Sequence, residues 1–203
     1  MEGLRFAYPL QPALFTGWST RIPPGVSLVC GGESSGKSTL LRLLAGDLAA
    51  QAGQLQVNGM PLATQPAAYR QQVFWTDPRS EAFDQTTALD TLASLGTRHP
   101  AFDTQAVPAL MQALSLTAHQ HKPLYMLSTG SKRKVWLVAA FASGAALILL
   151  DEPFAALDTV SIAVLLGLLR EKAAAQHPAR AWVLADYEAP AGVPLAATIT
   201  LGD

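Results

Sequence analysis

The residues best suited to chemistry lie in one glycine-rich stretch near the N-terminus. Gly31, four further residues and then Gly36-Lys37-Ser38 match the pattern of a phosphate-binding loop. Small residues let successive backbone N–H groups turn towards an anion, and the following helix points its positive end at the same place. We therefore expect bound nucleotide, with Lys37 on the β- and γ-phosphates and the Ser38 hydroxyl on Mg²⁺. The expected binding residues are Gly31, Gly32, Glu33, Ser34, Ser35, Gly36, Lys37, Ser38 and Thr39.

A pair of carboxylates forms the second candidate group. The apolar run 146–150 is followed directly by Asp151-Glu152-Pro153, as in a buried strand that delivers acidic side chains at its C-terminal end. We expect Asp151 to face the Mg²⁺ held by Ser38. Glu152 would then polarise the water that attacks the γ-phosphate. The alternative is a solvated acidic pair at a strand end.

The third group is Leu127-Ser128-Thr129-Gly130-Ser131, followed by Lys132-Arg133-Lys134. It can be a helix N-terminus with Ser128 or Ser131 as the cap. The helix dipole disfavours three cations at a helix start, whereas an incoming phosphate would suit them.

Short strands are expected around the loop. An apolar strand over 26–30 leads into it, and leucines provide an apolar face for the helix that follows. Asn58-Gly59 is typical of a type I′ hairpin turn. Further strands are expected over 4–8, 15–22, 54–57 and 71–75.

The rest of the chain changes from a helical pattern to alternating strand and helix. Such alternation indicates a parallel sheet covered by helices. The expected helices span 86–95, 106–116, 131–142 and 160–175, and the expected strands span 146–150 and 181–185.

Composition limits the class of protein. The chain has 203 residues, of which 50% are hydrophobic and 14% charged, with a net charge of −1. This predicts a globular chain without a nucleic-acid surface. The single Cys30 cannot form an internal disulfide and is expected to be buried. No signal peptide is expected at the N-terminus, and the apolar stretch 135–150 is too short to span a membrane.

The order of the motifs resembles that of the ATP-binding cassette (ABC) ATPases, with Ala156-Leu157-Asp158 after the acidic pair. The resemblance implies an α/β fold of the P-loop NTPase type: a RecA-like parallel-sheet core, an antiparallel β region and an inserted helical lobe. One ABC ATPase domain would span 1–203. Residues 1–77 and 146–203 would form the β region and core, and residues 78–145 the helical lobe. Length and compactness also resemble small exporter ATPases such as the haem-exporter subunit of cytochrome c maturation.

The resemblance further implies ATP and Mg²⁺ as cofactors, hydrolysis with Glu152 and Lys37 as catalytic residues, and a head-to-tail dimer. Ser128 and Gly130 would touch the γ-phosphate bound by the second subunit, and Asp158 would lie at the dimer contact. Tyr8 would stack on adenine. Membrane-embedded permease subunits would be the other partners, and no nucleic acid is expected. The chain would be cytoplasmic, held at the inner face of the membrane through those partners.

Two positions depart from the family pattern. Asp77 stands where a glutamine is usual, and Asp186 where a histidine contacts the γ-phosphate, so turnover is expected to be slow. Ser34 replaces a glycine, at some cost if its φ must be positive. The histidines are expected to have surface or packing roles; they are His99, His119, His121 and His177. The alternatives are a soluble ABC-type ATPase, a low-turnover half of a heterodimer and a simple P-loop kinase.

Overall fold

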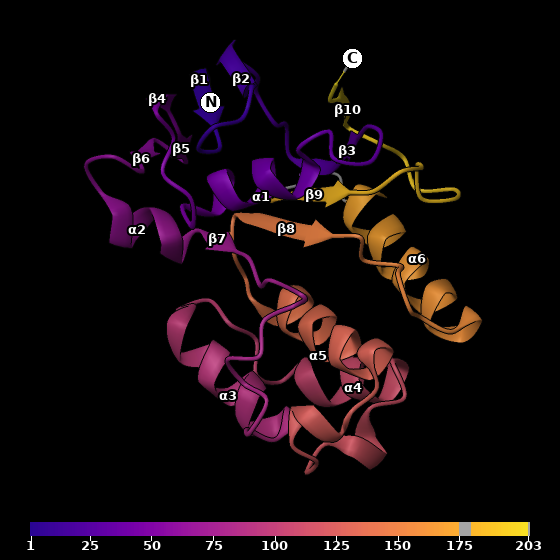
Figure 1. Ribbon diagram of the computed structural model, residues 1–203. Coiled ribbons are helices and arrows are strands. Elements are labelled where there is room, and N and C mark those ends of the chain that lie inside the picture. The colour runs from indigo at the N-terminus through magenta and orange to yellow at the C-terminus, as the bar shows by residue number, and fades with distance from the viewer. Residues whose placement is uncertain (175–179, 203) are drawn as a thin grey trace.

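A parallel five-stranded sheet lies at the centre of the described part of the chain, residues 1–174 and 180–202 of this computed structural model (Figure 1). The strand order is β10-β3-β9-β8-β7, and all neighbouring strands are parallel, so their C-terminal ends meet at one edge. The strands are β3 (Gly25–Cys30), β7 (Val73–Phe74), β8 (Leu147–Asp151), β9 (Ala181–Ala185) and β10 (Ala197–Thr200).

Both faces of this sheet are buried, which explains the uninterrupted apolar run in β8. Leu147 and Leu149 belong to the core on the face covered by α1 (Lys37–Ala45), whereas Ile148 and Leu150 belong to the core on the opposite face. A strand covered on both sides needs apolar residues at every position rather than at alternate ones. Helices α5 (Thr129–Ala142) and α6 (Thr159–Ala174) contribute to that opposite core.

An antiparallel region lies beside α1. Its three-stranded sheet has the order β2-β1-β4, and a separate hairpin pairs β5 with β6. Asn58 and Gly59 both have positive φ at the hairpin turn, as a type I′ turn requires. The elements are β1 (Glu2–Ala7), β2 (Ala13–Trp18), β4 (Ala52–Gln54), β5 (Gln56–Val57), β6 (Met60–Pro61) and α2 (Pro66–Gln71).

A group of helices occupies the lower part of the molecule in Figure 1, on the side of the sheet away from α1. It comprises α3 (Ala88–Arg98), α4 (Val107–Ala113), the short 3₁₀ turns η1 (Thr117–His119) and η2 (Leu124–Met126), and α5. The α5 helix joins this group to the sheet, because the ring of its Phe141 lies 4.5 Å from that of Trp182 in β9. No helix within the described residues is long and apolar enough to cross a membrane.

Several local expectations were wrong. The strand expected over 15–22 ends at Trp18. No element was expected over 66–70, and residues 66–71 form α2, so Gln71 lies in a helix and not in the strand expected over 71–75; Pro66 stands at a position that favours a helix start. Strand β7 is reduced to two residues, and β10 was not expected at all. Cys30 is half-buried, with its sulfur 3.6 Å from the Thr200 hydroxyl, instead of fully buried. The expected helix end at Ala175 and His177 lie outside the described residues.

Candidate nucleotide-binding site

The glycine-rich loop connects the end of β3 to the start of α1, as the sequence predicts. Gly31 admits no side chain, because a Cβ there would overlap with the Leu201 carbonyl oxygen and the Ser35 hydroxyl. Gly36 has a φ of 95° immediately before the helix, a value that glycine adopts at little cost. Ser34 has a φ of 61°, so the serine at this position does carry backbone strain.

The Lys37 side chain points back into the loop. Only 7% of the residue is exposed, and its ammonium group donates to the carbonyl oxygens of Gly31 and Gly32, both at 2.8 Å. The same Nζ lies 4.1 Å from the centre of the Tyr187 ring. Within the described residues no carboxylate forms an ion pair with it. This cation therefore holds neutral partners that an incoming anion can replace.

Asp151, at the C-terminal end of β8, has the properties of a ligand for a hard cation. Its Oδ1 atom is buried without a hydrogen-bond partner. Burial raises the pKa of its carboxyl group above the ordinary value, and a hydrogen bond with the Ser38 side chain opposes that rise. A buried carboxylate oxygen beside a hydroxyl is a donor set that fits Mg²⁺, because this cation prefers oxygen ligands.

Glu152 has an unusual backbone for its residue type, with a φ of 44°. Its N–H donates to the carbonyl oxygen of Ala185 at 2.9 Å. Its own carbonyl oxygen, together with that of Asp151, accepts hydrogen bonds from the Arg133 guanidinium. The backbone on both sides of Glu152 is therefore held by neighbouring elements.

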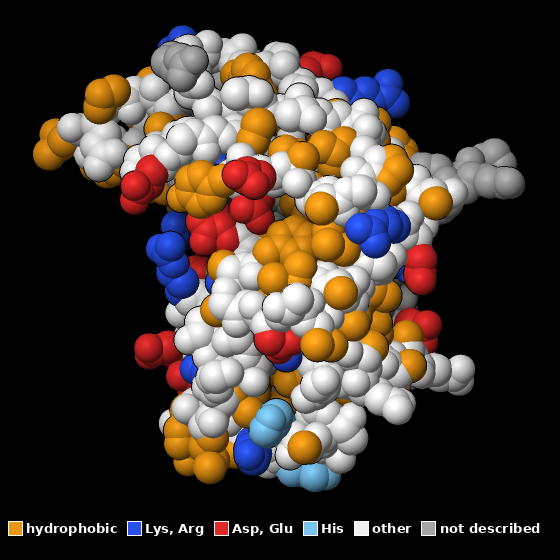
Figure 2. All heavy atoms as spheres, turned by 90° about the vertical axis from the view of Figure 1, so that its right-hand side faces the viewer, with side chains coloured by type: hydrophobic (Ala, Val, Ile, Leu, Met, Phe, Trp, Pro, Cys, Tyr) orange, Lys and Arg blue, Asp and Glu red, His pale blue; other side chains and the backbone are white. Residues whose placement is uncertain are grey.

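The C-terminal end of β9 lies close to the glycine-rich loop and to the end of β8. The N–H of Asp186 donates to the carbonyl oxygen of Val29 at 3.1 Å. Burial raises the pKa of the Asp186 carboxyl group, the Tyr187 N–H lowers it, the Glu152 charge raises it and the Lys37 charge lowers it. The loop and the two strand ends thus share one electrostatic environment. Because β8 and β9 end on the right-hand side of Figure 1, Figure 2 looks onto this edge, where acidic side chains gather in its upper half.

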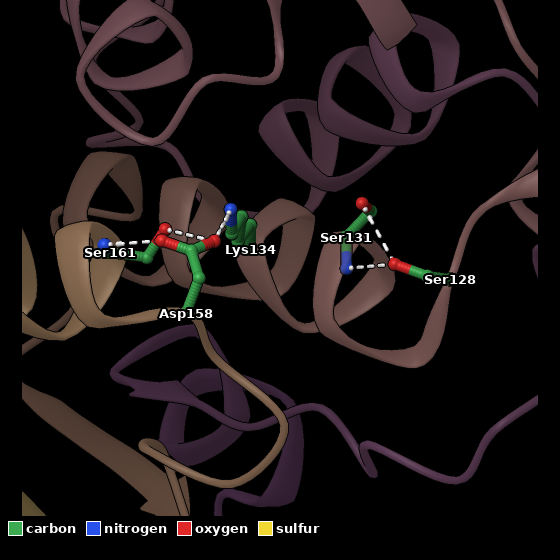
Figure 3. Close-up of polar contacts among 5 residues, drawn as sticks. All are labelled: Ser128, Ser131, Lys134, Asp158 and Ser161. Atoms are coloured by element: carbon green, nitrogen blue, oxygen red, sulfur yellow. Dashed lines mark hydrogen bonds and ion pairs between the residues drawn. The ribbon is translucent and has the colours of Figure 1, made fainter.

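Residues 127–131 connect the turn η2 to α5, which begins at Thr129. Ser128 is its N-cap: the Ser128 hydroxyl accepts the Ser131 N–H at 3.1 Å (Figure 3). Gly130 leaves no room for a side chain, because a Cβ would overlap with the Ala156 carbonyl oxygen. The helix-cap interpretation is therefore confirmed for Ser128, while contact with a phosphate stays a prediction.

The comparisons with known proteins agree on one family. The family model described as ABC transporter matches residues 15–155. The chain belongs to the ABC transporter family. It is 38% identical over 137 residues to the cytochrome c biogenesis ATP-binding export protein CcmA of Pseudomonas savastanoi pv. phaseolicola (strain 1448A / Race 6). That match covers 68% of this chain and 64% of the relative.

Solved ABC structures share the fold. The chain resembles an ATP-binding subunit of an ABC transporter with a TM-score of 0.81 and 23% identity, over 92% of this chain and 78% of that one. It also resembles a bacterial Atm1-family ABC exporter with ATP bound, with a TM-score of 0.79 and 19% identity, over 99% of this chain and 36% of the exporter. The expected α/β fold of the P-loop NTPase type is confirmed.

Two residues that the ABC resemblance singled out have local partners. The Tyr8 hydroxyl lies 3.1 Å from the Thr39 hydroxyl, which places the ring beside the phosphate loop and its helix. Asp77 is exposed, and its carboxylate accepts the Arg79 N–H at 2.9 Å in the turn after β7. Stacking of Tyr8 on adenine and a sensing role for Asp77 both stay predictions.

Sequence reasoning missed two residues of this ABC site, Tyr187 and Arg133. Tyr187 is 54% exposed and contacts Lys37 through its ring, which no pattern in the sequence indicates. Arg133 had a signal, the unfavourable run of cations at a helix start, but its acceptors belong to β8 and the residue that follows it. The division into 1–77 with 146–203 and 78–145 stays a prediction.

Proposed function

We propose that this chain is the ATP-binding subunit of an ABC transporter and that it hydrolyses ATP to drive membrane-embedded permease subunits. One observation carries the proposal: Asp151 has a buried carboxylate oxygen without a partner beside Ser38, the residue that follows Lys37 in the phosphate loop. Family membership supports it.

Each of these residues has a separate role in the proposed reaction, which follows from its position. Lys37 exchanges the carbonyl oxygens of Gly31 and Gly32 for phosphate oxygens, which gain more from its charge than neutral acceptors do. The Ser38 hydroxyl and the Asp151 carboxylate hold Mg²⁺, which when bound neutralises charge on the β- and γ-phosphates. Glu152 orients the attacking water and accepts its proton.

A second ABC ATPase subunit, identical or different, completes each site in this proposal. Among the described residues, no hydrogen bond connects Ser128 or Gly130 with the phosphate loop of the same chain. A second subunit arranged head to tail would bring its own Ser128 and Gly130 to the γ-phosphate, at a helix N-terminus that suits an anion. Asp158, which the resemblance places at the dimer contact, and the exposed Val160 lie a few residues after Glu152 in the sequence.

The helical part, residues 78–145, is proposed to dock with the permease and to hold the chain at the cytoplasmic face of the membrane. Tyr125 and Met126 support this, because they are large apolar side chains that are 56% and 58% exposed there. Similarity to the export protein CcmA of Pseudomonas savastanoi favours export over import, and a role in cytochrome c biogenesis.

The decisive test is Glu152→Gln. This variant should bind a fluorescent ATP analogue as the parent does, lose hydrolysis and accumulate as an ATP-bound dimer in size-exclusion chromatography. Glu171→Gln, an exposed change on α6, serves as the matched control. Parental hydrolysis by Glu152→Gln would exclude Glu152 as the base.

A second candidate is a low-turnover half of a heterodimer, and Asp186 favours it. Its half-buried carboxylate stands where the ABC resemblance predicts a histidine donor, and a negative charge there opposes a γ-phosphate. Asp186→His should raise ATPase activity several-fold, and Asp186→Asn should raise it less because it removes the charge without supplying a cation. Unchanged activity in both variants would exclude Asp186 as the cause of slow turnover.

A further inference from the structure

Three consecutive cations at the start of α5 bind three different parts of the chain. Lys132 pairs with Asp84 of the helical part at 2.6 Å. Arg133 donates to the main-chain carbonyls of Asp151 and Glu152. Lys134 pairs with Asp158 at 2.6 Å (Figure 3). Arg133 and Lys134 therefore hold the two ends of segment 151–158, which contains the proposed base.

Segment 151–158 adopts a conformation that its sequence does not favour. Glu152 has a φ of 44° and Ala156 a φ of 60°, and neither is glycine. Non-glycine residues keep such values when the surrounding structure holds them. The exit of the segment is well held, because Asp158 also accepts the Ser161 N–H at 2.8 Å and the Ser161 hydroxyl at 3.0 Å.

The hold on Glu152 comes from two directions. Strand β9 fixes its N–H through the Ala185 carbonyl oxygen, and α5 fixes its C=O through Arg133. With both peptide groups held, the direction in which the Glu152 side chain leaves the backbone is determined. A change at the start of α5 would therefore alter the direction of the carboxylate.

We propose that Arg133 is a positioning residue: from the start of α5, it determines the direction in which the Glu152 carboxylate points. Lys134 secures the far end of the same segment. The inference rests on the proposed function of Glu152. It gives the start of α5 two tasks: Ser128 and Gly130 face the second subunit's nucleotide, and Arg133, one turn later, holds the base of its own subunit.

The experiment compares Arg133→Gln with Lys132→Gln in the full chain. Arg133→Gln should lower kcat about ten- to a hundredfold, the size of loss that a small misplacement of a catalytic group causes. The dissociation constant of a fluorescent ATP analogue should change less than about twofold, because the hydrogen bonds of Arg133 go to the Asp151 and Glu152 carbonyls and not to the phosphate loop. Lys132→Gln removes a neighbouring charge whose partner is Asp84, and should leave kcat unchanged.

Two further variants separate positioning from simple structural damage. Arg133→Lys keeps a cation and should restore part of the lost kcat; it also replaces Arg133→Gln if the latter does not fold. Adding Arg133→Gln to Glu152→Gln should not lower the residual hydrolysis, measured in a single turnover with excess enzyme, any further, since the group that Arg133 positions is then absent. Parental kcat in Arg133→Gln, or a further loss in the double variant, would overturn the inference. Parental hydrolysis by Glu152→Gln alone would instead refute the role of Glu152 as the base, which the proposed function assigns.

Discussion

The phosphate loop and segment 151–158 meet at the same site, but they reach their backbone conformations by different means. In the loop, Gly36 adopts a φ of 95° at little cost, and Ser34 alone, with a φ of 61°, is a left-handed residue other than glycine. In the segment, the left-handed residues are Glu152 and Ala156, for which such a φ costs about 1–2 kcal/mol each. The loop is thus shaped largely by its own residues, whereas the segment depends on contacts from other elements.

Those contacts come mainly from the start of α5. Arg133 and Lys134 bind the two ends of the segment, and Gly130 lets the Ala156 carbonyl approach the helix closely. The Lys134 ammonium is the main cause, and hydrogen bonds from Ser161 a further cause, of a pKa of Asp158 well below its usual range. The ion pair between Lys134 and Asp158 therefore persists in weakly acidic solution. A strained segment that contains the proposed base is therefore sensitive to changes outside the site itself.

Loss of the loop's cation should have the largest effect. Lys37→Ala removes the ammonium group that faces the phosphates, and ATP affinity should fall about a hundredfold or more, measured by titration with a fluorescent analogue. Lys122→Ala, an exposed change, should leave affinity unchanged. Tight ATP binding by Lys37→Ala would contradict the assignment of the phosphate loop.

A side chain between α5 and the segment should have the next largest effect. Gly130→Ala places a Cβ against the Ala156 carbonyl oxygen and should reduce the free energy of unfolding by about 1–3 kcal/mol in urea denaturation. Gly167→Ala in α6 is the control, because nothing lies within 4 Å of its Cβ position. It should stabilise the protein by up to about 1 kcal/mol. Equal stability of the two variants would contradict the dependence of the segment on α5.

A pH effect is expected away from both regions, where the His99 ring packs against Phe74 with ring centres 5.4 Å apart and ring planes tilted by 46°. Burial lowers the pKa of His99 below 6.5, a hydrogen bond with the Gln71 backbone opposes this, and the Arg98 charge adds to the lowering. Below about pH 6.5 the unfolded chain then binds more protons than the folded chain. The contribution of His99 to the free energy of unfolding should therefore be fully present above about pH 6.5 and be lost as the pH falls through the folded-state pKa.

The matching variant is His99→Phe, which should flatten this pH dependence in urea denaturation between pH 5 and pH 7, by up to about 1 kcal/mol. His121→Gln, at an exposed position, should preserve the slope. An unchanged slope in His99→Phe would show that a group other than His99 causes the acid sensitivity.

Relief of strain inside the loop should have the smallest effect. Ser34→Gly removes the cost of a φ of 61° at a non-glycine residue and should stabilise the protein by about 0.5–1 kcal/mol, after the greater flexibility of glycine in the unfolded chain is subtracted. Ser35→Gly, at a neighbouring loop position without positive φ, should be destabilising. A gain from Ser35→Gly equal to that from Ser34→Gly would contradict local strain as the explanation.

The sequence alone predicted the parts of this protein that depend on neighbouring residues. The phosphate loop, the turn at Asn58-Gly59, the buried runs that became β3 and β8, and the cap at Ser128 all follow from short-range patterns. The spacing of glycines, the continuity of apolar runs and the preferences for capping residues are properties of a few neighbouring residues. They therefore predict local structure from the sequence alone. The ABC resemblance added the order of the motifs and the fold class.

Only the tertiary structure decided the remainder. Strand β10 forms because it pairs with β3, some 170 residues earlier in the chain, and its four residues carry too weak a pattern to be predicted. The roles of Arg133 and Tyr187 depend on contacts with segments that are distant in sequence. Glu152 was identified by type and place, but its left-handed backbone is imposed by β9 and α5. Local preference determined where phosphate and carboxylate chemistry is located, and long-range packing determined how the proposed base is held there.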